Sequence, residues 1–305
     1  MTGAVAIFTD EPGWHGRQLQ QWLARGGYQA EFVSLSDCTV NVSARTSGGS
    51  GLHIPGFDDR LPQGAFVRGI AGGSLEAITL RLDVLHLLAD LGCPVFNSAR
   101  TIERSVDKAM TSLRLHTAGV PTPAAFTTAS TEDLKTYTRE KLLAGCKLVK
   151  KPLFGSQGQG LRLISSTDDV RPLLPGEIAY VQEFVEAPGD IFRDWRVMVV
   201  DGRAVAAMER RHNHWITNRA KGAQCHAVDV ADDMAAIAVQ AAWAIRAEYT
   251  GVDLLRNADN EWQVIEINGI PAWQGLQRAT GINVTAALGA AFVRRMNAKN
   301  VRESA

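Results

Sequence analysis

The sequence predicts an α/β first half followed by an α+β second half, and three observations support this division. Near the start, the apolar run AVAIFTD is followed by a helical pattern at 13–25 and then by the strand-like EFVSLSD, an alternation typical of a parallel sheet. Pro121 and Pro123 then mark a boundary. From residue 178 the pattern is dense in strands, and Asp201-Gly202 between two apolar runs predicts a hairpin.

The remaining elements of the first half follow the same alternation. AFVRG at 65–69 and the later CPVFN are strand-like, whereas 75–92 and 101–119 have helical periodicity. The glycine- and serine-rich stretch 43–56 lacks the strand-then-helix context of a phosphate-binding loop. We therefore expect a surface loop there, with a phosphate cradle as the alternative.

Beyond the two prolines, helical patterns alternate with hairpins. The sequence predicts helices at 131–144, 231–248 and 283–298. KLVKKPLFGSQGQGLRLI reads as a hairpin with a glycine-rich tip, and VDLL with WQVIEIN forms a second hairpin. We expect three parts: an N-terminal α/β domain at 1–120, a small domain at 121–185 that carries the glycine-rich hairpin, and a C-terminal domain at 186–305.

Composition excludes several classes of protein. The 305 residues include 32 basic and 32 acidic side chains, a balance that argues against nucleic acid as the main partner. The chain is 46% hydrophobic and 21% charged, as in soluble globular proteins. The apolar run 235–245 is too short to cross a bilayer, and the N-terminus lacks the features of a signal peptide. We expect a cytoplasmic protein whose scattered cysteines are reduced thiols: Cys38, Cys93, Cys146 and Cys225.

One candidate site is basic and rich in glycine. Lys150 and Lys151 end a predicted strand, and glycines at 155–160 follow at the hairpin tip. Backbone N–H groups in such a tip can approach phosphates while a neighbouring lysine neutralises their charge. Glycine-rich hairpins are common, so an ordinary structural hairpin is the alternative.

A second candidate site contains oxygen ligands. Glu266 and Asn268 are two residues apart on a predicted strand, so both point to one face, with Val264, whereas Ile265 and Ile267 face the core. Asp253 lies on the preceding strand of the same hairpin. Such oxygen donors suit Mg²⁺. The alternative is a solvated polar face, although these residues interrupt otherwise apolar strands.

Other features are less specific. VQEFV at 181–185 could present its backbone to an adenine ring or could be an ordinary edge strand. His212, His214 and His226 lack the spacing of a transition-metal site. The tryptophans of the second half are expected in the core or in interfaces, with Trp273 the best candidate for stacking on an aromatic substrate.

The order of these features resembles the ATP-grasp superfamily, and within it the RimK-like ligases that add glutamate to a carboxylate acceptor. The resemblance runs from about residue 65 to 295 and depends on VKKPLFGSQGQG, TGVDLL and VIEINGIPAWQGLQRATGINV. The stretch from GSLEAITLRLDVLHLLADLG to ERSVDKAMT is similar to the branch that acts on coenzymes of the tetrahydromethanopterin, deazaflavin and methanofuran types. The fold implied is an ATP-grasp fold with an N-terminal parallel-sheet domain, a central small domain and a C-terminal antiparallel-sheet domain.

The resemblance also implies roles for individual residues. The residues expected to bind ATP are Lys108, Lys151, Gly155, Ser156, Gly158, Glu183, Phe184, Val185, Asp194 and Asn218. The expected ligands of Mg²⁺ or Mn²⁺ are Asp253, Glu266 and Asn268, and the expected catalytic residues are Lys151, Arg196 and Arg210.

The sequence departs from the family pattern at three places. Ile216 stands where an arginine is expected, so Arg219 or Lys221 would have to supply a positive charge. The run before the Asp-x-Arg motif is long, which leaves Asp190 as an alternative to Asp194. Ala272 replaces a glycine after the metal-binding strand.

The activity implied is ATP-dependent carboxylate–amine ligation through an acyl phosphate. We expect L-glutamate to be joined to a small coenzyme precursor of the tetrahydromethanopterin or methylofuran type, by a homodimer or tetramer that binds neither nucleic acid nor membrane. The alternative is a non-catalytic, nucleotide-binding regulatory module with the same fold, for which Ile216 leaves room.

Overall fold

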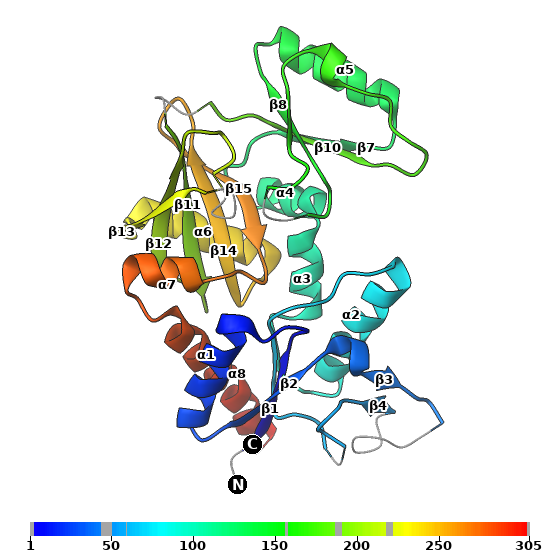
Figure 1. Cartoon of the computed structure of the whole chain (residues 1–305), viewed down its shortest axis with the longest axis vertical. Helices are drawn as coiled ribbons and strands as arrows, with labels where there is room; N and C mark the ends of the chain where they lie inside the picture. Colours follow the sequence, from blue (N-terminus) through cyan, green and yellow to red (C-terminus); the bar gives the residue numbers. More distant parts are fainter. Residues whose placement is uncertain are drawn as a thin grey trace.

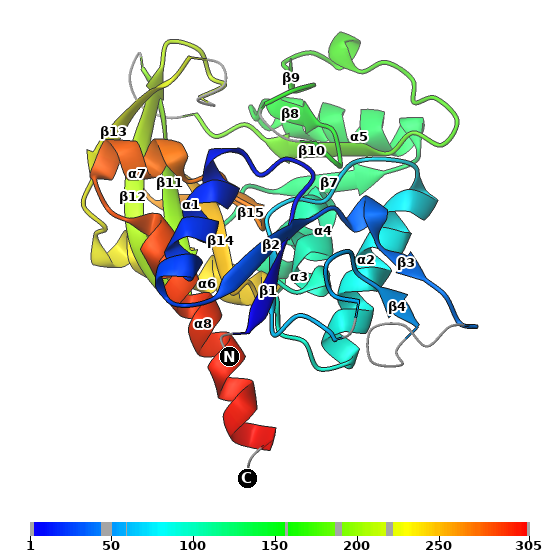
Figure 2. The same ribbon diagram turned by 60° about the horizontal axis from the view of Figure 1, so that its bottom comes forward.

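Three sheets and a short two-stranded ribbon organise the chain in a computed structural model. It describes residues 3–43, 51–58, 60–155, 158–186, 191–217 and 222–303, with side chains as far as residue 298. In Figures 1 and 2 the small sheet and α5 lie at the upper right, above the parallel sheet, and the large sheet lies to the left. The observed mixture of parallel and antiparallel sheets confirms the predicted fold class.

The first sheet is parallel. Its strands lie in the order β2 (Gln29–Val33), β1 (Ala4–Phe8), β5 (Ala65–Val67) and β6 (Val95–Phe96). The helices α1 (Gly13–Arg25) and α2 (Leu75–Asp90) connect these strands. A short 3₁₀ turn (Leu35–Asp37) and the ribbon of β3 (Thr39–Val40) and β4 (Leu52–His53) lie between β2 and β5.

The helix predicted at 101–119 is interrupted at Asp107. α3 (Ala99–Val106) ends there and α4 (Lys108–Thr117) begins. The Asp107 carboxylate accepts a hydrogen bond from the Met110 backbone at 3.0 Å, which caps α4. This break makes Lys108 the first residue of α4.

The small sheet is antiparallel and has its own core. Its order is β7 (Ala125–Thr128), β10 (Ala179–Glu183), β8 (Leu148–Lys151) and β9 (Arg162–Ile164), and α5 (Thr131–Leu143) packs on it. The glycine-rich hairpin joins β8 to β9, as predicted. β10, which contains most of VQEFV, lies inside the sheet and not at its edge. A second 3₁₀ turn (Thr167–Asp169) precedes β10.

The large sheet is antiparallel. Its order is β13 (Gln224–Val228), β12 (Arg203–His212), β11 (Phe192–Val200), β14 (Tyr249–Arg256) and β15 (Trp262–Asn268). The turn between β11 and β12 has positive φ at Asp201 and Gly202, as the hairpin signal predicted. α6 (Asp232–Ile245) packs on one face through Ala238, Ala241 and Ile245. The strands β7 and β13 and the helix α7 (Gln274–Thr280) were not predicted.

The large sheet and the parallel sheet share one core. Ile7 and Phe66 of the parallel sheet, Met198 and Tyr249 of the large sheet, and Phe292 of α8 (Val284–Glu303) belong to the same buried cluster. The C-terminal helix α8 therefore returns to α1 at the start of the chain, as Figure 2 shows. The division into three domains at 120 and 185 remains a prediction.

A buried amide connects the same two sheets. The Asn97 side chain donates to the carbonyls of Tyr249 and Gly269, both at 2.7 Å, and accepts from the N–H groups of Glu248 and Tyr249 at 2.9 and 3.1 Å. Asn97 is completely buried. This side chain fixes the start of β14 and the segment that follows β15.

Candidate active site

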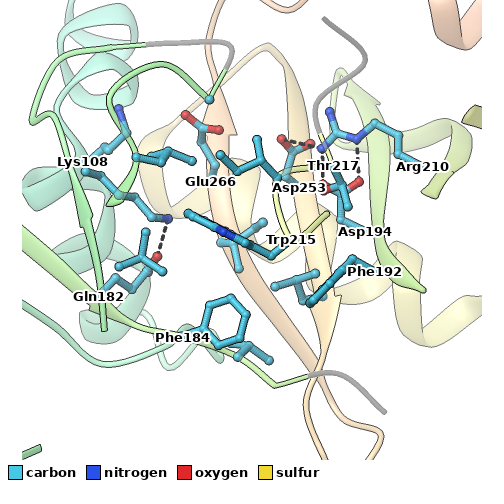
Figure 3. A pocket seen from close by; sticks show the side chains of 18 of the residues that line it. Lys108, Gln182, Phe184, Phe192, Asp194, Arg210, Trp215, Thr217, Asp253 and Glu266 are labelled. Atoms are coloured by element: carbon cyan, nitrogen blue, oxygen red, sulfur yellow. Dashed lines mark hydrogen bonds and ion pairs between the residues drawn. The ribbon is translucent and has the colours of Figure 1, made fainter. Parts of the chain in front are cut away.

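A cleft lies between the small sheet and the large sheet. Its volume is about 980 Å³, open mouth included. β8, β10 and the glycine-rich hairpin line one side, and β11, β12, β14 and β15 line the other. Figure 3 shows charged side chains and aromatic rings from these elements around the same space. Most of the predicted site residues are brought together here.

Two lysines lie at the base of the cleft. Lys108 donates to the carbonyl of Gly155 at 2.9 Å, and Lys151 donates to the Gln182 side chain at 2.6 Å. Burial lowers the pKa of Lys151 to about 8; Glu266 and Asp253 oppose this effect, whereas Lys108 adds to it. Burial also lowers the pKa of Lys108. Since buried cations are stabilised by anions, this corner of the cleft is suited to phosphate groups.

Two arginines hold two buried aspartates on the neighbouring face of the large sheet. Arg210 bonds Asp194 through two contacts at 2.5 and 2.7 Å and lies 3.0 Å from Asp253. Arg196 forms a second bidentate pair with Asp253, with one contact at 2.7 Å. Burial would raise the pKa of Asp253, but Arg196 and Arg210 outweigh it and hold this pKa below its ordinary value. Asp253 is therefore an anion at neutral pH.

The pKa of Asp194 moves in the opposite direction. Burial raises it, although Arg210 and the Thr217 hydroxyl, which donates to Asp194 at 2.5 Å, oppose the shift. Asp194, Arg210 and Thr217 all line the cleft, whereas Arg196 is not among the lining residues. The predicted catalytic Arg196 thus contacts the cleft only through Asp253.

A β-bulge determines which residues of β15 face the cleft. Asp253 pairs with Glu266, but Leu254 pairs with Val264, so Ile265 is the extra residue. Val264 and Ile267 consequently both enter the core beneath α6, whereas Ile265 and Glu266 both line the cleft. The prediction that Val264 shares the face of Glu266 and that Ile265 faces the core is wrong because alternation fails at the bulge.

Asn268 lies on the same face as Glu266, as predicted. The register from Glu266 to Asn268 is regular, and Asn268 pairs with Gly251. Its amide lies 3.5 Å from the Gly251 carbonyl, and it is not among the residues that line the cleft. Asn268 therefore lies beside the cleft, two residues beyond Glu266 on β15.

The donor set suits a magnesium ion. Asp253 and Glu266 are cross-strand neighbours, and both carboxylates line the cleft. Mg²⁺ in nucleotide sites commonly takes one or two carboxylates, its other ligands being water and phosphate oxygens. Within the described ranges no group of three His, Cys, Asp or Glu side chains is arranged for a metal, so a site built on His212, His214 or His226 is not supported.

The other end of the cleft is apolar. Phe184, Val185 and Leu255 line it, together with Phe192 and Trp215. In Figure 3, Phe184 and Phe192 lie away from the carboxylates of Glu266 and Asp253. Apolar walls beside a basic corner are the combination that binds a flat ring with attached phosphates.

The expected adenine segment 183–185 lies at this end, but several of its polar groups have partners. The backbone N–H groups of Glu183 and Phe184 donate to Ala124 and Lys147, each at 2.8 Å. The Glu183 carboxylate accepts from Lys141 at 2.7 Å. Contact between Glu183 and a ribose would compete with this ion pair.

Several residues named in the sequence analysis lie outside the described ranges, whereas their neighbours line the cleft. Ser156, Asp190, Asn218, Arg219 and Lys221 fall outside the described residues. Gly155, Gly158 and Ile216 line the cleft. Half of the loop at 43–56 (residues 44–50) is also outside, and Leu52 and Ile54 in its described part are buried.

Trp273 is a core residue, as expected of these tryptophans, whereas its stacking role and the buried place of Trp215 are wrong, and Gln182 was not predicted. Trp273 is completely buried and donates to Thr285 at 2.9 Å, so it cannot stack on a substrate in this conformation. Trp215, expected in the core or in an interface, lines the cleft. Gln182 follows the apolar run AYV on β10, and its place on a strand beside Lys151 was the available signal.

The fold and the cleft define an ATP-grasp protein, and comparison with known sequences identifies its family. The RimK-like ATP-grasp domain matches residues 105–292. The chain belongs to this family.

Two curated relatives are tetrahydromethanopterin:alpha-L-glutamate ligases. That of Methanococcus maripaludis is 32% identical over 230 residues, 72% of this chain and 75% of the relative. That of Methanosarcina acetivorans is 27% identical and covers 92% of this chain and 94% of the relative. A probable alpha-L-glutamate ligase of Aeromonas salmonicida is 30% identical over 92% of this chain and 93% of the relative. These matches favour a catalytic ligase over the regulatory alternative.

Solved structures share the fold. The ATP-grasp ligase PsnB complexed with its minimal precursor has a TM-score of 0.74 and 20% identity, covering 96% of this chain and 99% of PsnB. The D-cycloserine synthetase DcsG has a TM-score of 0.69 at 19% identity and covers 96% of this chain and all of that one. In the described part of the chain, no helix is both long and apolar enough to traverse a bilayer.

Proposed function

We propose that the protein is an ATP-dependent carboxylate–amine ligase that joins L-glutamate to a small coenzyme-like acceptor. One observation carries this proposal: a basic corner, an apolar wall and a pair of cross-strand carboxylates meet in one cleft between two separate sheets. The names of the family's relatives supply the expectation of glutamate and of a coenzyme acceptor.

In this proposal the nucleotide spans the cleft. Its base lies against Phe184, Val185 and Trp215, and its phosphates lie near Lys108 and Lys151. Both lysines are half-buried near acidic groups, so their charge is positioned before phosphate arrives. The glycine-rich hairpin around Gly155 and Gly158 covers the phosphates and excludes water.

The metal site of the proposal is formed by Asp253 and Glu266, with Asn268 next to them. Mg²⁺ or Mn²⁺ held there supplies charge neutralisation for phosphate oxygens. Arg210 lies between Asp194 and Asp253, so its guanidinium is fixed at the edge of the cleft. We assign to it the stabilisation of negative charge on the transferred phosphoryl group, and to Arg196 the orientation of Asp253.

The reaction then proceeds in two transfers. The acceptor carboxylate attacks the γ-phosphorus of ATP, which gives an acyl phosphate and ADP. The amine of glutamate attacks the acyl carbon, and phosphate leaves as the amide forms. No protein nucleophile takes part, since positioning and electrostatics supply the catalysis. We also propose that the protein is cytoplasmic and forms a homodimer or tetramer. The division of the chain into three domains at residues 120 and 185 is part of the same proposal.

The experiment that tests this function supplies purified protein with ATP, Mg²⁺, isotope-labelled L-glutamate and a small-molecule extract. Mass spectrometry should detect a product heavier by glutamyl units that requires ATP, and the product identifies the acceptor. If labelled product forms only with another amino acid, glutamate is the wrong substrate. If no amino acid is incorporated while nucleotide binds, the ligase assignment is wrong.

A further inference from the structure

Arg68, at the end of β5, differs from the arginines of the cleft. Arg196 and Arg210 bond carboxylates, and Arg193 lies 3.4 Å from Glu209. The guanidinium of Arg68 forms neither an ion pair nor a hydrogen bond with any residue that the structure describes, and its Nε atom is buried without a partner. An unpaired charge in such surroundings costs free energy, which a ligand carrying an anion would recover.

The surroundings of Arg68 hold its side chain in place. The guanidinium lies over the ring of Trp273, 5.1 Å from the ring centre. Trp273 is itself fixed, because it is completely buried and bonded to Thr285. A cation over an indole keeps its charge and leaves the edge of its guanidinium available to a planar anion.

The neighbours of Arg68 leave its charge uncompensated. Tyr249 is close to it, but burial raises the pKa of this phenol, and its hydroxyl is used in a bond to the Val67 carbonyl. Burial lowers the pKa of Arg68, as expected of a cation without a carboxylate beside it. Arginine nevertheless stays protonated at neutral pH.

The position of Arg68 connects it to the proposed reaction centre. Tyr249, Gly251 and Asp253 alternate along β14 and therefore share one face. A Cβ atom on Gly251 would lie 3.0 Å from the Arg196 side chain and 3.1 Å from Pro271. Arg196 and Pro271 therefore pack directly on the backbone of Gly251, between Tyr249 and Asp253. Asp253 lies about 13 Å along the strand from Tyr249. This separation is comparable to the combined length of an amino acid and the carboxyl group with which it reacts.

The sheet geometry supports the same placement. β5 is a central strand of the parallel sheet, and Arg68 follows its carboxyl end. Ligands of open parallel sheets bind at this edge. The segment from Asn268 to Trp273 leads from the metal-binding strand to Arg68, so the same chain segment borders both places.

We propose that Arg68 binds a carboxylate of one of the ligase substrates, and that this carboxylate does not itself take part in amide formation. This inference rests on the proposed function, since a ligated amino acid keeps its own α-carboxylate and a coenzyme acceptor can carry a second one. Arg68 orients this substrate from the parallel sheet, while the large sheet holds the phosphates.

The test compares Arg68→Met, which keeps most of the side-chain volume, with Arg68→Lys and the exposed control Arg100→Met. Labelled L-glutamate is titrated at a fixed amount of extract, and the extract is titrated at fixed glutamate. We expect Arg68→Met to raise one of the two apparent KM values roughly 10- to 100-fold, with partial recovery in Arg68→Lys and none of this loss in Arg100→Met. A raised KM for glutamate assigns the carboxylate to the amino acid, and a raised KM for the extract assigns it to the acceptor.

Two further measurements keep the outcome decisive. Arg68→Met should unfold at the same or a higher temperature than the unchanged protein, because an unpaired charge is removed. Equilibrium dialysis with labelled L-glutamate and with extract components, in the presence of nucleotide, measures binding without turnover. Unchanged affinity for both, or an equal loss in Arg100→Met, overturns the proposal. Failure of the unchanged protein to form product contradicts the ligase function instead, and the dialysis still decides the role of Arg68.

Discussion

Asp253 and Glu266 face each other across β14 and β15, yet their carboxylates are held differently. Asp253 is 1% exposed and bound by Arg196 and Arg210. Glu266 lines the cleft and forms no ion pair with any described residue. One carboxylate therefore belongs to a buried network, and the other is available to ligands.

The two acids should respond differently to amide substitution. Asp253→Asn leaves Arg196 buried without its anion and is expected to lower the free energy of unfolding by about 3 kcal/mol. Glu266→Gln should change it by less than about 0.5 kcal/mol and should still abolish ligation. Urea unfolding and product formation measure the two effects. Normal turnover in Glu266→Gln would refute the metal assignment, and equal stability of both variants would refute the buried network.

Nucleotide binding should weaken as the pH rises through the pKa of Lys151. This pKa is about 8 because the ammonium is buried. The protonated form binds phosphate, so the Kd for ADP measured without metal should rise between about pH 7 and 9. Lys151→Arg keeps its charge over this range and should give a flatter profile. A profile of the same slope in both proteins would assign the pH dependence to another group.

Glu248 should make stability depend on pH. Burial raises its pKa to about 7, although Arg295 and the Ser98 N–H group oppose the shift. Between the ordinary pKa near 4.5 and this value, the folded state keeps a proton that the unfolded state has lost. The free energy of unfolding therefore falls as pH rises through this window, by up to roughly 3 kcal/mol.

Glu248→Gln removes the carboxyl group that titrates in this range. Its stability should vary less between pH 4.5 and 7 than that of the unchanged protein, and it should be the more stable of the two at pH 8. Thermal or urea unfolding at a series of pH values provides the measurement. Parallel curves for the two proteins would show that Glu248 does not titrate in this range.

Asn97 should be intolerant of truncation. Asn97→Ala removes the side-chain partner of four backbone groups, which belong to Glu248, Tyr249 and Gly269. We expect a loss of at least about 3 kcal/mol in the free energy of unfolding. The exposed Asn41→Ala serves as the control and should lose less than about 1 kcal/mol. A similar small loss at Asn97 would show that water replaces its contacts.

The regular elements could be predicted from the sequence because their patterns are local. The strand at Ala4–Phe8 and the hairpin at Asp201-Gly202 follow from apolar runs and turn residues. The short β13 and α7 carry no such periodicity and depend on packing against β12. The break at Asp107 was visible in principle, since an aspartate before a helical run is a common cap.

The candidate site was predicted at the level of residue types but not of orientation. Asp253, Glu266 and Lys151 converge as the motifs implied. The bulge at Ile265 could not be predicted, because it arises from strand pairing between residues distant in sequence. Trp273 lies in the core, as expected of these tryptophans, but Trp215 lines the cleft, because burial of an aromatic ring depends on the neighbouring sheet and not on its own segment.

The small sheet has a core of its own, so we expect it to open as a separate cooperative unit. The small sheet packs around Leu148 and Val181, apart from the core that the parallel and large sheets share. Amide hydrogens of β8 and β10 should therefore exchange through a local opening that leaves β1 and β11 protected. A nucleotide that contacts Lys151 on one unit and Glu266 on the other would join them, so its binding should slow exchange in the small sheet most of all.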